Sequence, residues 1–316
     1  MNTMLAFDFS CNDVFGAAQV LPLQGERLHL NEGPIDLIIG AEGEPAAVST
    51  AYQRIARRFE GLLGELVAEL PHLRQQLRTP AHRFQGRVAS LMANAVSKHA
   101  DDFVTPMAAV AGAVADEMIA QVNDLTGLRK IYVNDGGDIA FHQSPNETIS
   151  IGLVSVLQTA TVDGSIRIPA AAPIRGVATS GMDGRSLSFG IADAVTALAR
   201  SAAEADVAAT LIANAVDIND PAIERIPANE LDPDSDLGGR LVTVSRGPLS
   251  ETGVRQALEC GTARATQMMN DGKIEAALLA CDGQIRIVED PKCQISETLI
   301  PYEDADNRRP QRRTKS

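Results

Sequence analysis

The chain has 316 residues, a formal net charge of −13, no tryptophan and only 3% aromatic residues. That length suffices for one large domain or two modest ones, and 45% apolar with 22% charged residues is ordinary for a soluble globular protein. An acidic chain repels nucleic-acid phosphates and anionic membranes, and scarce aromatic rings leave little base stacking. We therefore expect neither a nucleic-acid nor a membrane partner.

The last ten residues, 307–316, differ from the rest because they carry basic side chains and no acidic one. The basic residues are Arg308, Arg309, Arg312, Arg313 and Lys315. A short polar segment of this kind, with a proline inside it, is typical of a frayed terminus. We predict a single domain over residues 1–306, followed by a basic disordered tail over 307–316.

The cysteines give no sign of a disulfide framework or a zinc site. Cys11, Cys260, Cys281 and Cys293 show no Cys-x-x-Cys spacing and no nearby histidine pairing. The first residues lack the basic and apolar regions of a signal peptide, and no apolar run is long enough to span a bilayer. These features predict a cytoplasmic protein with reduced thiols.

In the first half of the chain, hydrophobic periodicity predicts helices that alternate with short strands. Residues 1–32 have weak patterning and read as irregular chain or short strands. An apolar stripe from Ile55 to Leu73 that includes Leu66 predicts a core-facing helix, kinked or divided at Pro71. The predicted elements are a strand at 35–39, a helix at 46–77, a helix at 107–125, a strand at 130–134 and a strand that begins at 139–141.

In the second half, hairpins and two long helices dominate the prediction. Asp163-Gly164 and Asp282-Gly283 read as hairpin turns. The residues between the two helices are rich in Asp, Asn and Pro and read as a long loop. The predicted elements are strands at 149–157 and 165–168, a helix at about 191–216, a loop at 217–239, a strand at 241–244, a helix at 251–269 and strands at 273–280 and 284–288.

These elements together predict an α+β fold with helices packed on a mostly antiparallel sheet. Two segments also resemble each other, since each reads as a helix followed by two strands joined through an Asp-Gly turn. The first turn is Asp135-Gly136 and the second is Asp282-Gly283. Because such turns are common, the resemblance admits either a duplicated α-β-β unit or coincidence.

Residues 176–195 form the most informative segment, because small, hydroxyl-bearing and glycine residues follow one another there. Glycines let a backbone approach a ligand closely. Hydroxyls, free N–H groups and the start of a helix together bind anions. With the helix predicted to begin at about 191, this block predicts an anion-binding loop that leads into a helix. Arg185 within it has a planar guanidinium suited to phosphate or carboxylate.

Three motifs in the middle third of the chain resemble the FAD:protein FMN transferase (ApbE-type) superfamily. They are Val133-Asn-Asp-Gly-Gly-Asp138, Thr179-Ser-Gly181 and Ala205-Asp-Val-Ala-Ala-Thr210. They occur in the order and at about the spacing of that superfamily, and the chain is most similar to an uncharacterised branch of it. The resemblance implies the transferase fold and a pocket for an anionic small molecule or a flavin nucleotide, FAD or FMN.

The same resemblance implies a set of site residues. Asp206 and Thr210 occupy the positions that bind magnesium in the transferases, and i and i+4 residues share a helix face. Asp206 and Thr210 could equally be a surface carboxylate and a hydroxyl bonded to its own helix. No catalytic residue is assigned. The expected ligand-binding residues are Asn134, Gly136, Gly137, Asp138, Thr179, Ser180, Gly181, Arg185, Ser188 and Asp193.

The chain also departs from the transferases. Ala111 stands where they carry a lysine, and 184–193 contains neither the histidine nor the proline of their His-x-Ile-Asp-Pro stretch. Three functions therefore remain open: a Mg²⁺-dependent transferase of flavin or phosphoryl groups, a non-catalytic binding or assembly protein of the same fold, and a catabolic enzyme that acts on a small carboxylate without flavin. The sequence leaves the oligomeric state open, a homo-oligomer included.

Overall fold

The structure is a computed structural model that describes residues 18–77, 82–154, 162–290 and 300–301. Its centre is a nine-stranded sheet with the order β1-β2-β3-β4-β5-β8-β9-β12-β13, in which every neighbouring pair is antiparallel. These strands are β1 Gln19–Leu23, β2 Arg27–Glu32, β3 Ile35–Gly43, β4 Leu128–Asp135, β5 Asp138–Gln143, β8 Gly176–Ser180, β9 Ala194–Ala199, β12 Ala276–Cys281 and β13 Gln284–Glu289.

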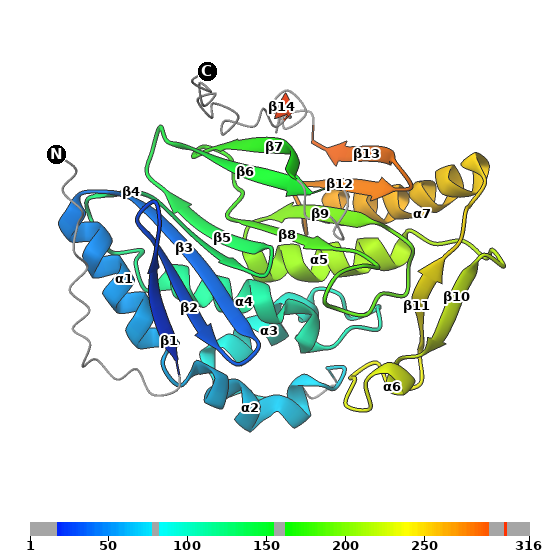
Figure 1. Ribbon diagram of the computed structural model, residues 1–316, viewed down its shortest axis with the longest axis horizontal. Helices are drawn as coiled ribbons and strands as arrows, with labels where there is room; N and C mark the ends of the chain where they lie inside the picture. Colours follow the sequence, from blue (N-terminus) through cyan, green and yellow to red (C-terminus); the bar gives the residue numbers. More distant parts are fainter. Residues whose placement is uncertain (1–17, 78–81, 155–161, 291–299, 302–316) are drawn as a thin grey trace, which may run out of the picture.

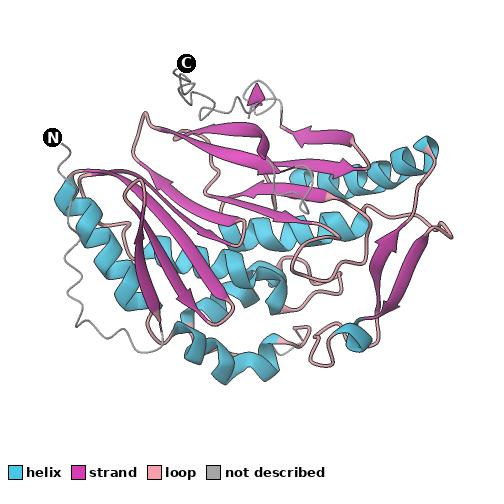
Figure 2. Cartoon of the chain, viewed as in Figure 1, coloured by secondary structure: helices cyan, strands magenta, loops and turns pink. Residues whose placement is uncertain are grey.

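The helices cover one face of this sheet, and a small second sheet packs on part of the other face (Figure 1; Figure 2). The larger core lies between the sheet and the helices, and the smaller one lies beneath β6 Thr148–Val154 and β7 Val162–Pro169. The helices are α1 Pro45–Phe59, α2 Leu62–Leu73, α3 Arg87–Ser97, α4 Val110–Ala120, which follows the 3-10 turn η1 Pro106–Ala109, α5 Ala202–Ala215, α6 Ala228–Leu231 and α7 Glu251–Asn270. The fold is α+β, as the sequence predicts.

The structure corrects the prediction of one helix over 191–216. Residues Ala194–Ala199 form β9, which is buried along its whole length and pairs with β8 and β12. A short buried strand and a buried helix segment cannot be told apart by periodicity, because neither alternates. The helix α5 begins only at Ala202, after the N-cap Ser201. The 176–195 block is therefore a β8–loop–β9 hairpin and does not lead into a helix.

Other predicted boundaries also move. Gly61, with φ +75°, separates α1 from α2, so the predicted 46–77 helix is two helices, with Pro71 inside the second. Asp163 and Gly164 lie within β7, where Gly164 pairs with Leu153, and so do not form the predicted turn. The predicted strand residues 155–157 lie outside the described residues. The predicted loop 217–239 contains β10 Ile223–Pro227 and α6.

The two similar segments of the sequence are both α-β-β units of the main sheet. In one, α4 packs on the hairpin β4–β5, and in the other, α7 packs on the hairpin β12–β13. The second hairpin turns at Asp282 and Gly283, which both have positive φ, as the sequence predicts. The prediction of one domain over 1–306 stays a prediction, and the basic segment 307–316 lies outside the described residues.

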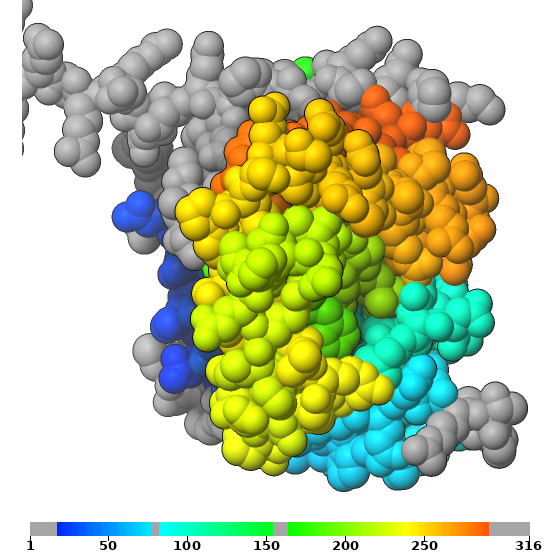
Figure 3. All heavy atoms as spheres, turned by 90° about the vertical axis from the view of Figure 1, so that its right-hand side faces the viewer, coloured from blue at the N-terminus to red at the C-terminus, as the bar shows by residue number. Residues whose placement is uncertain are grey.

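The segment that contains β10, α6 and β11 Leu241–Arg246 forms one end of the molecule (Figure 3). Its two strands pair with each other and lie apart from the main sheet. The guanidinium carbon of Arg240 lies 3.2 Å from the ring centroid of Phe103, and the Thr105 hydroxyl donates to the Asp236 carboxylate. These contacts hold the segment against the chain that leads into η1 and α4.

The first turn of α5 is held by α4. The Asp116 carboxylate accepts the N–H groups of Ala202 and Ala203, each at 2.9 Å, and the Ser201 hydroxyl accepts that of Glu204 at 3.2 Å. Burial raises the pKa of Asp116 to about 6. Because side chains of this protein already satisfy the orphan N–H groups of α5, the start of α5 is closed as an anion site.

We predict that Asp116→Ala lowers the free energy of unfolding by roughly 1–3 kcal/mol, because two buried N–H groups lose their acceptor. Urea unfolding followed by circular dichroism measures this change. The matched control is Asp124→Ala, which removes only an exposed ion pair to Arg54 and should cost less than about 1 kcal/mol. Equal costs for the two variants would contradict the capping role of Asp116.

Candidate functional site

A cavity of about 630 Å³ lies between α2 and the central helices, and it is apolar on one side and polar on the other. The apolar side comes from α2, α3, η1 and α4. The polar side comes from the β4–β5 turn, the end of β8, the loop after it and α5. Its polar side chains belong to Asp135, Asp138, Thr179, Ser180, Arg185, Ser186, Asp206 and Thr210.

The β4–β5 turn places two carboxyl groups at this cavity. Gly136 (φ +63°) and Gly137 (φ +120°) adopt backbone conformations that favour glycine. The side-chain oxygen of Asn134 accepts the Gly137 N–H at 2.8 Å, which closes the turn. Asp135 and Asp138 pair across the hairpin ends, and both line the cavity.

A close contact between α4 and α5 places the third carboxyl group. A Cβ atom on Gly112 would lie 2.3 Å from the carbonyl oxygen of Ala202, so only glycine allows the two helices to approach this closely. At this contact the Gly112 N–H donates to the Asp206 carboxylate at 3.1 Å. Thr210 lies one turn further along α5 and lines the same cavity.

Asp206 and Asp138 meet directly, because their side chains share a hydrogen bond. Asp138 also accepts the Thr179 N–H at 3.2 Å, and the Thr179 hydroxyl lies 2.8 Å from that of Thr196. Burial raises the pKa of both carboxyl groups, and for Asp206 the negative charge of Asp138 raises it further. Burial and mutual repulsion thus disfavour two ionised carboxylates at this contact.

Asp135 is a third acid with a raised pKa, and it is 6% exposed. Burial raises its pKa to about 7, against the lowering effects of the Asp36 N–H and the Arg185 charge. Arg185 lies over the turn, since a Cβ on Gly136 would be 3.3 Å from its Nη1 atom. Arg185 is the cationic side chain of the polar side.

The donor set at this end of the cavity fits a hard divalent cation. Mg²⁺ takes oxygen ligands and usually binds one or two carboxylates, with water and substrate phosphate as its other ligands. Asp138 and Asp206 supply two carboxylates, and Thr210 supplies a hydroxyl. Within the described part of the chain, no group of three or more His, Cys, Asp or Glu side chains is arranged as a metal site. The arrangement therefore suits a metal that shares its coordination with a ligand.

Seven of the twelve residues that the sequence predicts for the site line this cavity together. They are Gly136, Asp138, Thr179, Ser180, Arg185, Asp206 and Thr210. They come from segments up to about 75 positions apart, and the antiparallel pairing of β5 with β8 and the packing of α5 beneath them bring them to one place. Their roles in binding remain predictions.

The other five lie outside the cavity lining and have internal partners. Asn134 and Gly137 bond to each other within the turn. Gly181 packs against the Asp193 carbonyl, where a Cβ would lie 2.4 Å from the oxygen. Ser188 bonds to Asn214 at 3.2 Å. Asp193 forms an ion pair with Arg246 at 2.9 Å and accepts the Asp282 N–H at 2.6 Å.

The large cavity is also lined by residues that the sequence does not predict for the site. Asp135 could be found from its place in the Asp-Gly-Gly-Asp turn, but the α2 wall could not be separated from the core by periodicity. Leu66 shows why, since it is only 7% exposed, belongs to the main core and also lines the cavity. Ala111, the position of the lysine in the transferases, lines the cavity as well, and it contributes only a methyl group there.

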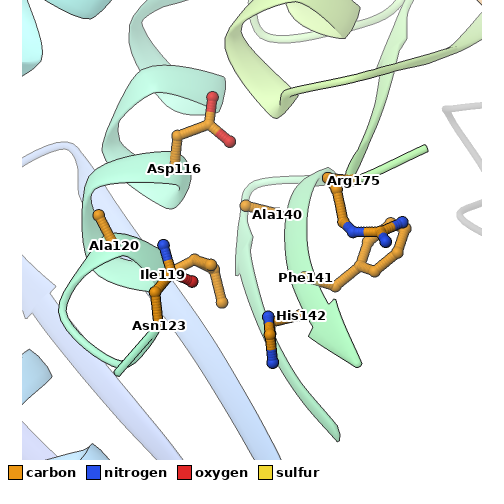
Figure 4. A pocket seen from close by; sticks show the side chains of 8 residues that line it. All are labelled: Asp116, Ile119, Ala120, Asn123, Ala140, Phe141, His142 and Arg175. Atoms are coloured by element: carbon orange, nitrogen blue, oxygen red, sulfur yellow. The ribbon is translucent and has the colours of Figure 1, made fainter. Parts of the chain in front are cut away.

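A second cavity, of about 240 Å³, lies between α4 and β5 (Figure 4). The charged side chains that line it either make hydrogen bonds within the protein or point away from one another. Asp116 points to the start of α5, and Arg175 donates to the carbonyls of Ala170, Ala172 and Ile174. His142 lies at the other end of the group in Figure 4. The larger cavity is therefore the candidate site.

Acidification should stabilise the protein through Asp135. The pKa of Asp135 is about 7 in the folded chain and about 3.9 in an unfolded one. Between these values the folded state binds more protons, so the free energy of unfolding rises as the pH falls from about 8 to about 5. Asp135→Asn lacks the buried charge, and we predict that it is more stable than the wild type at pH 8 by roughly 1–3 kcal/mol.

Urea unfolding at both pH values measures this difference, which should shrink towards pH 5. Asp101→Asn, on an exposed position, controls for the change in net charge. A wild type that loses stability between pH 8 and pH 5 by the same amount as Asp135→Asn would contradict the buried charge.

Comparison with known proteins gives relatives of one kind. The chain is 40% identical over 113 residues to UPF0280 protein MJ1526 of Methanocaldococcus jannaschii, a match that covers 35% of this chain and 45% of that protein. It is 33% identical over 193 residues to UPF0280 protein MK0206 of Methanopyrus kandleri, which covers 60% of this chain and 75% of the relative. The chain thus spans less than half of the first relative and three quarters of the second.

Among solved structures, the chain is similar to the apo form of the flavinyl transferase ApbE of Pseudomonas stutzeri. The sequence identity is 15%, the TM-score is 0.38, and the match covers 88% of this chain and 95% of that one. None of the described helices is long and apolar enough to cross a membrane. A family model described as AbpE bacteria matches residues 18–287, which is most of the chain, and the protein therefore belongs to this ApbE-like family.

Proposed function

We propose that this protein binds a phosphate-bearing small molecule together with Mg²⁺ in the large cavity, and that a flavin nucleotide is the leading candidate. The observation that carries the proposal is the hydrogen-bonded carboxyl pair of Asp138 and Asp206 beside an apolar wall. Two neighbouring carboxyl groups attract a cation, and they bind an anion only through that cation. The choice of a flavin nucleotide as the leading ligand rests on the motif resemblance and on membership of the family.

Each polar residue has a distinct part in this proposal. Asp138, Asp206 and Thr210 hold the cation, which would neutralise phosphate charge and polarise a phosphoryl oxygen when bound. The hydroxyl of Ser180 and the guanidinium of Arg185 bind and orient the anion from the loop side. The apolar side lowers the local dielectric beside the carboxyl groups, which strengthens their interaction with a bound cation relative to water.

The chain departs from a complete transferase at Ala111, and this observation favours a second candidate function. Without the lysine that the transferases carry there, the cavity has one cation on its polar side, Arg185. A binding protein that holds the nucleotide without transferring it needs no second cationic side chain there. A single-turnover assay with FAD, Mg²⁺ and an acceptor protein that offers a Ser or Thr hydroxyl separates the two. Transfer forms an ester bond between that hydroxyl and the FMN phosphate, breaks the pyrophosphate bond of FAD and releases AMP with the hydroxyl proton, whereas simple binding leaves FAD intact.

We predict that Ser180→Ala and Arg185→Ala weaken nucleotide binding while the fold persists. Loss of a charge-assisted contact to a bound anion costs roughly 1.5–3 kcal/mol, about ten- to a hundred-fold in affinity. Asp206→Ala should abolish the dependence of binding on Mg²⁺. Isothermal titration with FAD and FMN, with and without Mg²⁺, measures all three variants.

Leu66 is unsuitable as the structural control because it lines the cavity, whereas Leu258 on α7 is fully buried and does not. Leu258→Ala should lower stability by roughly 2–5 kcal/mol and leave the affinity of the folded fraction unchanged. If neither nucleotide binds under any condition, the flavin proposal is wrong.

A further inference from the structure

The large cavity follows α2 along its length. At one end, Leu63 meets the turn before β3, where a Cβ on Gly33 would lie 2.8 Å from the Leu63 Cδ2 atom. At the other end, Arg74 caps α2 and also lines the cavity. Leu63 and Arg74 are eleven positions apart, which is about 16 Å at the helical rise per residue. The cavity is therefore long, with the carboxyl groups and Arg185 placed near the turn end.

The wall between the two ends is aliphatic. It is formed by leucine, valine and methionine side chains of α2, α3, η1 and α4, and none of the described residues that line the cavity is aromatic. Unbranched methionines at Met92 and Met107 adapt to irregular apolar shapes. Aliphatic side chains of this kind can pack along a flexible hydrocarbon chain over its whole length.

Arg74 has no partner at the end of this wall. Neither Arg74 nor Arg185 makes a hydrogen bond or ion pair through its side chain with any other described residue. By contrast, Arg58 on the neighbouring helix α1 is paired with both Glu65 and Glu117. An arginine that lines an apolar cavity without a carboxylate is suited to bind one from a ligand.

The wall is formed without a ligand, because side chains fix α2 to the next segment. The Glu69 carboxylate accepts the N–H of Gln85 at 2.9 Å and that of Gly86 at 2.7 Å, just before α3. On the same side, the rings of His72 and His82 stack with their centroids 3.8 Å apart. Arg74 therefore follows a helix that is held in place.

We propose that the α2 end of the cavity is a subsite for an aliphatic carboxylic acid, or for the acyl tail of a larger ligand that ends in a carboxylate. The carboxylate pairs with Arg74, and the hydrocarbon chain lies along α2 towards the turn end. This subsite rests on the proposed function only in that both ligands occupy the same cavity. Its contacts involve Arg74 and the aliphatic wall, and neither the carboxyl pair nor a metal.

The test compares dodecanoate with dodecanol and dodecylamine, each below its micellar concentration and without nucleotide or metal. Isothermal titration of the full chain should show dodecanoate binding at least tenfold more tightly than dodecanol, and dodecylamine binding weakest. Arg74→Gln should remove the preference for the acid, and Arg74→Lys should restore part of it. With ¹³C-carboxyl dodecanoate, the carboxylate resonance should titrate at lower pH when bound to the wild type than when bound to Arg74→Gln.

Arg255→Gln is the matched control, because Arg255 is exposed on α7, has no ion pair with another described residue and lies outside the cavity lining. It should bind dodecanoate as the wild type does. The proposal is overturned if dodecanoate does not bind, if the alcohol binds as tightly, if Arg74→Gln keeps the preference, or if Arg185→Gln removes it instead. Failure of nucleotide or Mg²⁺ binding would leave these titrations unchanged, so the two proposals fail separately.

Discussion

The close approach of α4 and α5 at Gly112 is the constraint on which the site depends. Only glycine fits there, since the carbonyl oxygen of Ala202 would lie 2.3 Å from a Cβ. The contact brings the Gly112 N–H to Asp206 and sets that carboxyl against Asp138. The same helix pair is locked a turn away by Asp116, which caps α5. Packing, capping and the position of the carboxyl pair are thus parts of one arrangement.

Burial of these acids has a cost that packing alone does not explain. Their pKa values are raised because apolar surroundings and mutual repulsion disfavour their charged forms. Natural proteins keep such destabilising groups where function requires them. Burial raises the pKa of Asp193 as well, but this carboxylate pairs with Arg246 and accepts the Asp282 N–H, so it serves to join the start of β9 to the neighbouring strands. Among the described residues, the cavity carboxyls form no ion pair with a basic side chain, and a bound cation would supply the missing positive charge.

Local patterns predict much of this fold and part of the site. Turn chemistry identified Gly136 and Asp282–Gly283, and the helical period identified α7, because these signals depend on neighbouring residues. The strand β9 reads as helix in the sequence because it is buried on both faces and therefore has no alternation. The loop motif located Thr179 and Ser180, but it could not show that Ser188 and Asp193 bond within the protein. Those partners, Asn214 and Arg246, lie far along the chain and meet only through tertiary packing.

Leu66 belongs to the core and also lines the cavity, and the sequence does not reveal this second role because it too depends on tertiary packing. An apolar stripe on a helix indicates which face is buried and cannot indicate whether that face meets other side chains or a cavity. The α2 stripe meets both. Arg74 and Arg185, at the two ends of the cavity, are likewise ordinary arginines in sequence. Among the described residues neither makes a side-chain hydrogen bond or ion pair, whereas Arg58 pairs with Glu117, although the charge of Arg185 does act on Asp135.

A cation site at Asp138 and Asp206 is tested most directly by an anomalous difference map from a crystal soaked in Mn²⁺, a scatterer with the oxygen preference of Mg²⁺. We expect one strong peak at the two carboxyl groups and the Thr210 hydroxyl, and its loss in Asp206→Asn. A map with no peak there, or with a peak that persists in Asp206→Asn, would contradict it.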